Sequence, residues 1–358
     1  MDQINSHWIA PTEFPDLSDR EKIAIDLETC DPGLMKDGPG WPKKIGAVIG
    51  IAVAANGFKA YYPIAHEGGG NMDSKKVIKY IRSLCENEKL DKIFHNAQYD
   101  IGWLSVLDIE VKGRIHDTMV AMALIDENRF SYTLNSISFD YLGEYKNEAK
   151  LKEAALAFGV DPKSEMYKLP ATFVGEYAEE DARLTLKLHE KLAWEIKKDN
   201  LDTIYDIECR LIRVIFNMTK KGVRFNIDKV MTLNDKFRNK EKKILKRVKD
   251  LTNQNVEIWA ASSISKAFDA LNLPYERTVK TEAPSFTKMF LTDHPHELPR
   301  LIMQARELNK LRGTFLQGLV KHNSNGRIHA HINQIRSDSG GTVTGRFSYN
   351  HPNLQQIP

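Results

Sequence analysis

The sequence predicts an α/β domain with a mixed β-sheet, followed by a mainly helical domain and a short final segment. Apolar runs of strand length alternate with helical patterns from Lys22 to about Leu192, an order typical of an α/β domain. From Leu201 the strand-like runs become rare and long amphipathic helices follow. At 358 residues the chain exceeds the size at which one core usually stops growing, so we expect more than one domain.

The elements of the first domain follow from short patterns in the chain. The predicted order is strand "KIAIDLET" from Lys22, strand "VIGIAVA" from Val48, strand "KAYYPIA" from Lys59, helix "SKKVIKYIRSLCENE" from Ser74 and strand "KIFHN" from Lys92, with further helices after it. The longest apolar run, "IGAVIGIAVAA", is shorter than the ~20 residues that span a bilayer. Acidic residues interrupt the N-terminal segment, which therefore does not resemble a secretion signal. We expect no membrane association.

The second half is dominated by helical patterns. The helix "DIECRLIRVIFNMTKKG" ends at Gly222, a favourable C-terminal cap after two lysines. We expect an irregular loop over residues 273–288, a helix over 298–319 and one strand in "GRIHAHINQI" over 326–335. The predicted domains are residues 1–200, 201–322 and 323–358.

Charge and cysteine content narrow the class of protein. The net charge is only +3, but residues 236–250 form a strongly basic helical pattern that suits phosphate binding or, alternatively, a solvated helix face. Cys30, Cys85 and Cys209 are too few and too scattered for a disulfide framework or a CxxC metal site. A reducing cytoplasm is the expected location.

Two acids in the first predicted strand are the first candidate site residues. Asp26 and Glu28 lie two apart, so both side chains project from one face of the strand. Their mutual repulsion on an apolar strand calls for a compensating cation, and a hard ion such as Mg²⁺ is the natural partner. The alternative is a strand end that reaches solvent, where both acids are harmless.

Two later segments add acids at helical spacing. In "HNAQYDIGWL", Asp100 follows Asn96 by four residues, which would place both on one helical face just beyond a strand. In "YAEEDARLTLKL", Tyr177 and Asp181 have the same spacing and continue into an apolar stripe. Asp181 could instead be a partly exposed charge beside a packed tyrosine. His95 and His116 are interpreted as packed histidines near the site.

Together these three segments resemble, in order and separation, the motifs of the DEDDy 3′-5′ exonucleases. The resemblance implies an RNase H-like (DnaQ-like) fold in which Asp26, Glu28, Asp100 and Asp181 position two divalent cations, Mg²⁺ or Mn²⁺. It also implies that Tyr177 helps to orient the attacking water. Asn96 is expected either to hold local structure or to contact the DNA.

The rest of the chain resembles the thumb and the beginning of the palm of family A DNA polymerases. The segments "IECRLIRVIFNMTKKGVRFN", "APSFTKMF" and "ARELNKLRGTFLQGL" follow the family's order, and "TGRFSYNHPNLQQIP" is the most specific match. The resemblance implies that Arg346, Asn353 and Gln355 approach the minor groove of a primer-template duplex, where acceptors look alike in every correct pair. The basic pattern over 236–250 would then meet phosphates.

The sequence departs from that family after Pro358, because the palm carboxylates and the fingers helix follow this motif in the family. We therefore expect a phage-like proofreading exonuclease that removes 3′-terminal nucleotides of single-stranded or frayed DNA and does not extend a primer alone. A second polypeptide carrying the palm and fingers would complete a split polymerase. A truncated gene product, a non-catalytic module that clamps DNA, and an RNase D-like exoribonuclease are the alternatives. For a phage protein the location would be the host cytoplasm.

Overall fold

The computed structural model describes residues 6–338 and 340–357. The chain forms two compact units, which are treated separately below. Unit 1 comprises the chain up to Gly222 together with residues 329–356, and unit 2 comprises Val223–Ile328. The sequence places its boundaries at residues 200 and 322 instead, and that division into three domains stays a prediction.

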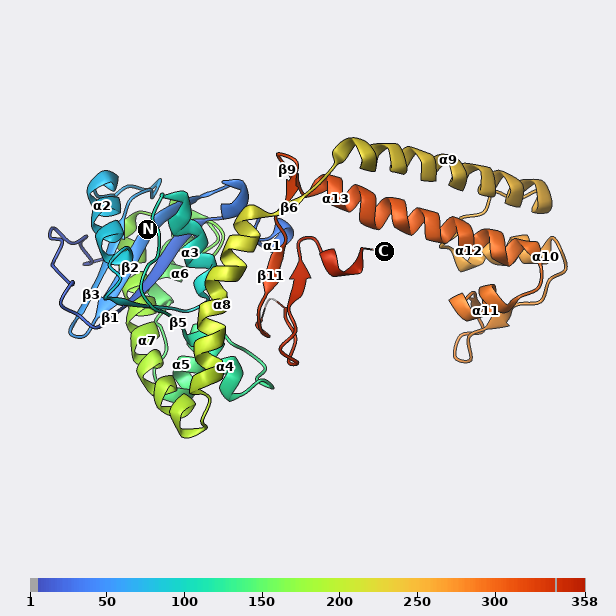
Figure 1. Cartoon of the computed structure of the whole chain (residues 1–358). Coiled ribbons are helices and arrows are strands. Elements are labelled where there is room, and N and C mark those ends of the chain that lie inside the picture. The colour runs from blue at the N-terminus through green and yellow to red at the C-terminus, as the bar shows by residue number, and fades with distance from the viewer. Residues whose placement is uncertain (1–5, 339, 358) are drawn as a thin grey trace. The chain divides into compact units, whose positions relative to one another are not determined.

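Unit 1 is an α/β domain with a five-stranded mixed sheet (Figure 1). Its elements in chain order are β1 (Lys22–Cys30), α1 (Leu34–Asp37), η1 (Trp41–Lys43), β2 (Ala47–Ala55), β3 (Phe58–Pro63), α2 (Ser74–Cys85), β4 (Asp91–Phe94), α3 (Ala97–Val106), β5 (Ile115–Asp117), α4 (Thr118–Ile125), α5 (Leu134–Leu142), α6 (Ala149–Phe158), η2 (Met166–Lys168), α7 (Ala171–Lys198), α8 (Asp202–Lys221), β11 (His331–Asn333), β12 (Ser348–Asn350) and η4 (Leu354–Gln356). The mixed α/β class predicted from the alternating pattern is confirmed.

The sheet has the strand order β3-β2-β1-β4-β5, with β1 at its centre. β1 pairs with β2 in antiparallel register, and β2 pairs with β3 in the same way. β1 and β4 are parallel, as are β4 and β5. The β1–β2 register shifts between Glu28 and Thr29, an irregularity of the β-bulge type. Bulges re-aim side chains and are frequent beside active sites.

The two faces of β1 enter different cores because side chains alternate along a strand. Ile23, Ile25 and Leu27 point into a large apolar core on one face. Ala24 lies on the other face, in a second core that α6 and α7 help to form, and Asp26 and Glu28 share its parity. Alanines dominate this second core where sheet and helix meet, at positions Ala24, Ala52, Ala54, Ala178 and Ala182. Small side chains here allow α7 to approach the face that carries the two acids.

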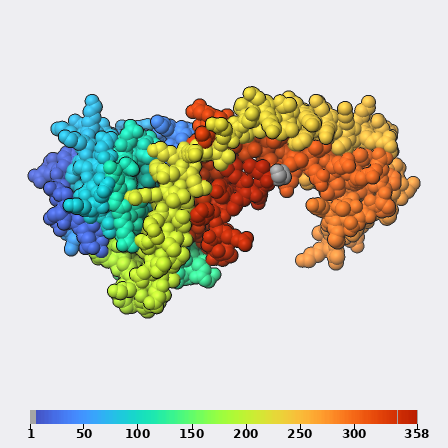
Figure 2. All heavy atoms as spheres, in the orientation of Figure 1, coloured from blue at the N-terminus to red at the C-terminus, as the bar shows by residue number. Residues whose placement is uncertain are grey.

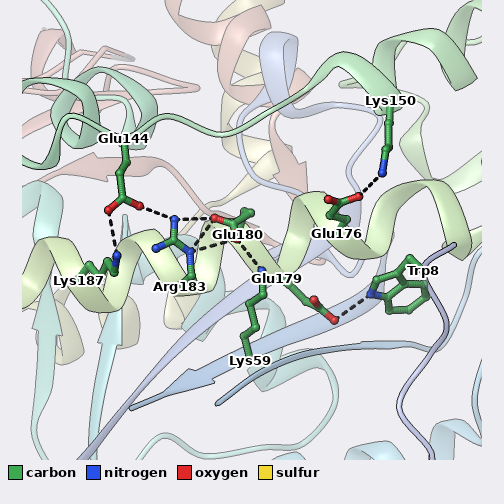
Figure 3. Close-up of polar contacts among 9 residues, drawn as sticks. All are labelled: Trp8, Lys59, Glu144, Lys150, Glu176, Glu179, Glu180, Arg183 and Lys187. Atoms are coloured by element: carbon green, nitrogen blue, oxygen red, sulfur yellow. Dashed lines mark hydrogen bonds and ion pairs between the residues drawn. The ribbon is translucent and has the colours of Figure 1, made fainter. Parts of the chain in front are cut away.

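The N-terminal segment is fastened to α7. Thr172 Oγ1 donates to the carbonyl of Trp8 over 2.9 Å. Figure 3 shows the second bond, in which Trp8 Nε1 donates to Glu179 Oε1 over 2.8 Å. A Cβ atom at Gly175 would lie 2.1 Å from the Trp8 ring, so the indole needs glycine beneath it. Hydrogen bonds between residues about 165 positions apart therefore hold the N-terminal segment against the first turn of α7.

The end of the chain belongs to unit 1 as a short hairpin of β11 and β12. Gln334 Nε2 donates to the backbone carbonyl of Glu208 over 2.7 Å, which ties the hairpin to α8. The single strand expected over 326–335 is a wrong prediction. Arg327–Ile328 pair with β6 and β9 of unit 2, whereas His331–Asn333 pair with β12, so two separate strands replace it.

Unit 2 is mainly helical. Its elements are β6 (Val223–Arg224), α9 (Ile227–Thr252), α10 (Ala261–Asp269), β7 (Glu276–Arg277), β8 (Pro284–Ser285), α11 (Lys288–Asp293), α12 (Glu297–Lys310), a π-helical turn η3 (Leu311–Leu316), α13 (Gln317–Lys321), β9 (Asn323–Ser324) and β10 (Arg327–Ile328). The predicted loop over 273–288 contains the short hairpin β7–β8. The predicted helix over 298–319 is present as α12, η3 and α13.

A buried ion pair joins the two long helical segments of unit 2. Glu241 of α9 accepts from Arg312 Nε over 3.2 Å and from Asn309 Nδ2 over 2.7 Å. The lysines and arginines of residues 236–250 lie mostly on the exposed side of α9, whose surface is seen along unit 2 in Figure 2. Among the described residues, no helix combines the length and apolar character needed to cross a membrane.

Candidate active site

Three carboxylates meet between β1 and α7. Oxygens of Asp26, Glu28 and Asp181 all lie within 4.8 Å of one another. Asp26 and Glu28 come from one face of β1, as their spacing predicts, and Asp181 is buried on the side of α7 that packs against the sheet. The structure therefore brings together acids that are about 155 residues apart in the chain.

A lysine lies beside this cluster. Lys146 Nζ donates to Asp181 Oδ2 over 2.9 Å and to the Tyr177 hydroxyl over 2.8 Å. Its ammonium group also lies 4.5 Å from the centre of the Tyr177 ring. The second carboxylate oxygen of Asp181, Oδ1, is buried and has no hydrogen-bond partner among the described residues. A buried carboxylate oxygen without a partner is costly, so this oxygen is available to accept a ligand.

Asp100 stands behind β1 and is not one of the three clustered acids. It is buried in the first turn of α3, and its Oδ1 accepts from the backbone N–H of Leu27 over 3.1 Å. Leu27 lies between Asp26 and Glu28, so this bond fixes the strand where it carries both acids. Asp100 is close enough to Asp26 for that carboxylate to raise its pKa.

Burial is the main influence on all four acids. It raises the pKa of Asp26 to about 7, with a further contribution from the Asp181 carboxylate. Burial likewise raises the pKa of Glu28 and of Asp100 well above their usual values, and the Asp26 charge adds to both. The pKa of Asp181 is also raised by burial, although Lys146 opposes the shift. All four shifts run in the direction that a nearby positive charge would oppose, as Lys146 does at Asp26, Glu28 and Asp181.

The pKa values of the two neighbouring groups are also shifted. Burial lowers the pKa of Lys146, but Asp181, Asp26 and Glu28 outweigh it, so the net shift is upward and the ammonium form is favoured. Burial and the nearby carboxylates raise the pKa of the Tyr177 phenol well above its usual value. Tyr177 is therefore a neutral phenol at physiological pH.

Asn96 does not lie on a helical face with Asp100, so that geometric prediction is wrong. Asn96 has a left-handed backbone, with φ of 73°, and precedes α3, which begins at Ala97. Its N–H donates to Asp117 Oδ1 over 3.2 Å, and the N–H of Ala97 donates to Asp117 Oδ2 over 2.7 Å. Asn96 also lines a small pocket with residues 331–335 of unit 1. Its contact with DNA stays a prediction.

The two candidate histidines are engaged in packing contacts. His95 Nδ1 lies 2.8 Å from Thr118 Oγ1, and burial together with the Lys146 charge lowers its pKa to about 4. The buried His116 lies 3.3 Å from Asp91 Oδ2 and stacks near the rings of His189 and Tyr205. Both rings are neutral at physiological pH because burial lowers their pKa values.

The three residues expected to meet a duplex lie in the C-terminal part of unit 1. Arg346, Asn353 and Gln355 are all exposed. Asn353 Oδ1 accepts from the backbone N–H of Gln355 over 3.1 Å, and Gln355 Nε2 donates to the carbonyl of Phe347 over 2.9 Å. The structure thus gives two of them a local turn-forming contact. Their binding to DNA stays a prediction.

Sequence reasoning missed two residues around the site. Lys146 belongs to the irregular connection between α5 and α6, where no periodicity singles it out. Asp117 is buried and accepts from the N–H groups of Asn96, Ala97, Met119 and Val120, so it joins the starts of α3 and α4. Its signal was readable, because an aspartate between a short apolar strand and a helical run is a favourable N-cap.

The donor set fits a hard divalent cation. The clustered ligand atoms are carboxylate oxygens, the type that Mg²⁺ and Mn²⁺ prefer. The raised pKa values and the unpartnered Asp181 Oδ1 indicate a deficit of positive charge, which a cation would supply. Asp26, Glu28 and Asp181 are the residues placed to share it.

Two family models match the chain. Residues 15–197 match a model described as 3′-5′ exonuclease, and residues 227–358 match one described as DNA polymerase family A. The first match contains the carboxylates of β1, α3 and α7. The second contains all of the C-terminal candidates Arg346, Asn353 and Gln355.

Curated relatives cover nearly the whole chain. A DNA-directed DNA polymerase of Pseudomonas phage M6 is 34% identical over 371 residues, which cover 99% of this chain and 56% of the relative. DNA polymerase DpoZ of Acinetobacter phage SH-Ab 15497 is 28% identical and covers 96% of this chain and 57% of that protein. DNA polymerase I of Pseudomonas aeruginosa is 27% identical, over 96% of this chain and 37% of the relative. The chain thus spans about half the length, or less, of these relatives.

A solved structure has the same fold. It is the POL domain of Pol1 from M. smegmatis in complex with DNA primer-template and dNTP, with a TM-score of 0.67 and 18% identity. The match covers 96% of this chain and 53% of that one. At this identity the likeness concerns the fold.

Proposed function

Because the chain belongs to the family A DNA polymerases and carries their 3′-5′ exonuclease domain, we propose that it removes 3′-terminal nucleotides from DNA as a proofreading nuclease. The carboxylate cluster carries this proposal, since Asp26, Glu28 and Asp181 offer oxygens within 4.8 Å of one another. The buried, unpartnered Oδ1 of Asp181, which lies beside two further carboxylates, supports the proposal that the cluster holds a cation.

The proposed reaction is hydrolysis of the last phosphodiester bond. Two divalent cations, Mg²⁺ or Mn²⁺, would supply an activated water and charge neutralisation at the attacking and leaving oxygens. Asp26, Glu28 and Asp181 would hold one of them. Asp100 would offer its Oδ2 as a further ligand for the cations, because its Oδ1 accepts a hydrogen bond from the N–H of Leu27.

Tyr177 has a separate proposed role beside the acids. Tyr177 lies four residues before Asp181 on α7, and its phenol oxygen accepts a hydrogen bond from Lys146 Nζ over 2.8 Å. A neutral phenol can both donate and accept hydrogen bonds. We assign it to orienting the water toward the phosphorus atom, which would place the nucleophile without carrying charge itself.

The C-terminal and helical parts would bring DNA to this site. Exposed Arg346, Asn353 and Gln355 suit hydrogen bonding in the minor groove of a primer-template duplex. The basic residues of α9 suit sequence-independent contacts with phosphates, and binding should weaken as salt rises. A palm and fingers on a second polypeptide, and a cytoplasmic location consistent with three free thiols, remain predictions.

The experiment is degradation of 5′-labelled single-stranded DNA by the purified chain with Mg²⁺ or with EDTA. We expect a ladder that shortens from the 3′ end, needs Mg²⁺ and disappears in Asp181→Ala. The matched control is Glu190→Ala, which removes an exposed acid of the same helix and should cleave normally. Undiminished cleavage by Asp181→Ala would overturn the site, and preference for an RNA 3′ end would overturn the substrate.

A further inference from the structure

The position of Lys146 has a consequence for how the site is loaded. Its side chain is only 14% exposed, and that of its partner Asp181 only 8%. Long basic side chains normally keep their charged end in water, and a buried ammonium group needs compensating negative charge. Lys146 finds it in Asp181, whose Oδ2 accepts from its Nζ, and the oxygens of Asp26 and Glu28 lie within 4.8 Å of those of Asp181.

The connection that carries Lys146 is clamped to α7 on both sides of the lysine. Before it in the chain, Glu144 pairs with Arg183 over 2.6 Å and with Lys187 over 2.9 Å. After it, Lys150 pairs with Glu176 over 2.8 Å. Figure 3 shows both clamps, with α7 supplying one partner of each.

The backbone of Lys146 is held as well. Its N–H donates to Asn135 Oδ1 over 3.1 Å. This bond and the ion pairs hold the chain on either side of Lys146, and its Nζ donates to Tyr177 and Asp181. The ammonium is therefore a fixed member of the carboxylate cluster.

A divalent cation held by Asp26, Glu28 and Asp181 would share Asp181 with this ammonium. Only Oδ1 of Asp181 is unpartnered, because Oδ2 accepts from Lys146. Two positive charges on one carboxylate repel each other, and low accessibility to water strengthens that repulsion. The lysine and the cation must then weaken each other's binding by the same factor.

We propose that Lys146 is the internal counter-ion of the exonuclease carboxylates: it keeps Asp26, Glu28 and Asp181 together when no metal is bound and competes with a divalent cation at Asp181. This inference rests on the proposed function, because it concerns the same cation site. Lys146 is here a positioning residue that sets the metal affinity of the site. Free chain binds cations weakly as a result.

The experiment measures Mn²⁺ binding to the chain without DNA, by calorimetry and by the electron paramagnetic resonance signal of free Mn²⁺. Lys146→Met should bind Mn²⁺ about tenfold more tightly, a coupling within the usual range for two interacting ligands. The same variant should unfold at a lower temperature in EDTA, since the acids have lost their counter-ion. Damage to the structure alone would weaken both properties, so opposite changes identify competition.

The control variants separate charge from position. Lys146→Arg retains the positive charge and should bind Mn²⁺ like the wild type. Lys152→Met removes one charge from an exposed lysine that pairs with Glu148, and should also leave the affinity unchanged. Lys146→Gln serves as a second variant if Lys146→Met does not fold.

Two results would overturn the proposal, and they differ in meaning. Equal or weaker Mn²⁺ binding by folded Lys146→Met or Lys146→Gln would remove the competition while leaving the proposed nuclease intact. Absence of Mn²⁺ binding by both the wild type and folded Lys146→Met would remove the cation site and the proposed function with it.

Discussion

Asp181 in unit 1 and Glu241 in unit 2 are both buried acids on long helices, and each accepts a hydrogen bond from one basic side chain. Glu241 has a partner for each oxygen, Arg312 at one and Asn309 at the other. Asp181 has Lys146 at one oxygen and nothing among the described residues at the other. Burial alone therefore does not distinguish the two acids, whereas the unpartnered oxygen of Asp181 and the carboxylates beside it support the proposed cation site there.

The largest expected effect separates the two acids by activity. Asp181→Asn should lower the cleavage rate by more than about 100-fold, because Asp181 is a proposed metal ligand and loss of a mere outer partner of a ligand already costs about 10–100-fold. Glu241→Gln keeps the shape of its side chain and should leave the rate unchanged. Single-turnover cleavage of a labelled strand measures both. A similar loss of cleavage rate in the two variants would contradict the assignment of Asp181 as a metal ligand and of Glu241 as a structural acid.

The second prediction concerns stability, for which Glu241 should matter although it does not matter for activity. Glu241→Ala leaves Arg312 and Asn309 without their buried partner, and should destabilise unit 2 by about 3 kcal/mol. Hydrogen exchange of the amides of α9 and α12 would report this loss locally. Lys249→Ala, at an exposed position of the same helix, is the control and should exchange like the wild type. Unchanged protection in Glu241→Ala would show that the pair contributes nothing.

The third prediction concerns Asp117, a buried acid that, like Glu241, has hydrogen-bond partners at both oxygens. We expect such an acid to stabilise the fold without taking part in the cation site. Asp117 accepts from four backbone N–H groups, so replacing it by asparagine leaves at least one donor facing an amide group. Asp117→Asn should reduce the free energy of unfolding by about 2 kcal/mol, as measured by urea denaturation. We expect its metal affinity to stay normal. A clear loss of Mn²⁺ binding with normal stability would place Asp117 in the site instead.

The smallest expected effect on stability comes from His66, a buried imidazole whose two ring nitrogens both have hydrogen-bond partners. His66 lies between the Tyr61 hydroxyl and the carbonyl of Leu169, and burial lowers its pKa to about 4. The unfolded chain binds the proton at the usual pKa near 6.5, so the stability from neutral His66 is complete above that pH. It is lost as pH falls through about 6.5 toward about 4.

The matching measurement compares His66→Gln with the wild type. Between pH 8 and pH 5.5, the wild type should lose about 1 kcal/mol more than the variant, which has no imidazole to protonate. Parallel curves would mean that His66 has an ordinary pKa. Unlike Asp181, this group has both of its polar atoms satisfied within the protein, so no added metal should alter the difference.

The sequence predicted the site to the extent that local periodicity defines it. The alternation around Asp26 and Glu28 and the helical stripe around Asp181 each reflect one element, and the structure joins these elements at the cluster. Lys146 could not be predicted, because its position depends on ion pairs that clamp an irregular connection to α7. These contacts exist only after the helix has packed.

The fold shows the same division between local and non-local information. The mixed α/β class follows from the order of strands and helices and is confirmed. Asn96 was placed on a helix wrongly, because a left-handed residue before Ala97 leaves no trace in spacing. The prediction of one strand over 326–335 is wrong because alternation does not reveal that the two halves of this segment pair with different strands.

The attachment of Trp8 to α7 has a consequence for synthesis. Thr172 and Glu179, which hold the segment around Trp8, leave the ribosome about 165 residues later. At ~5–20 residues per second, that delay is roughly 10–30 seconds. During it the opening segment and the face of β1 that carries the two acids lack the cover of α7. A nascent chain halted before Ala171 should therefore be a ready target for proteases and chaperones, and protection should arrive abruptly once α7 has emerged.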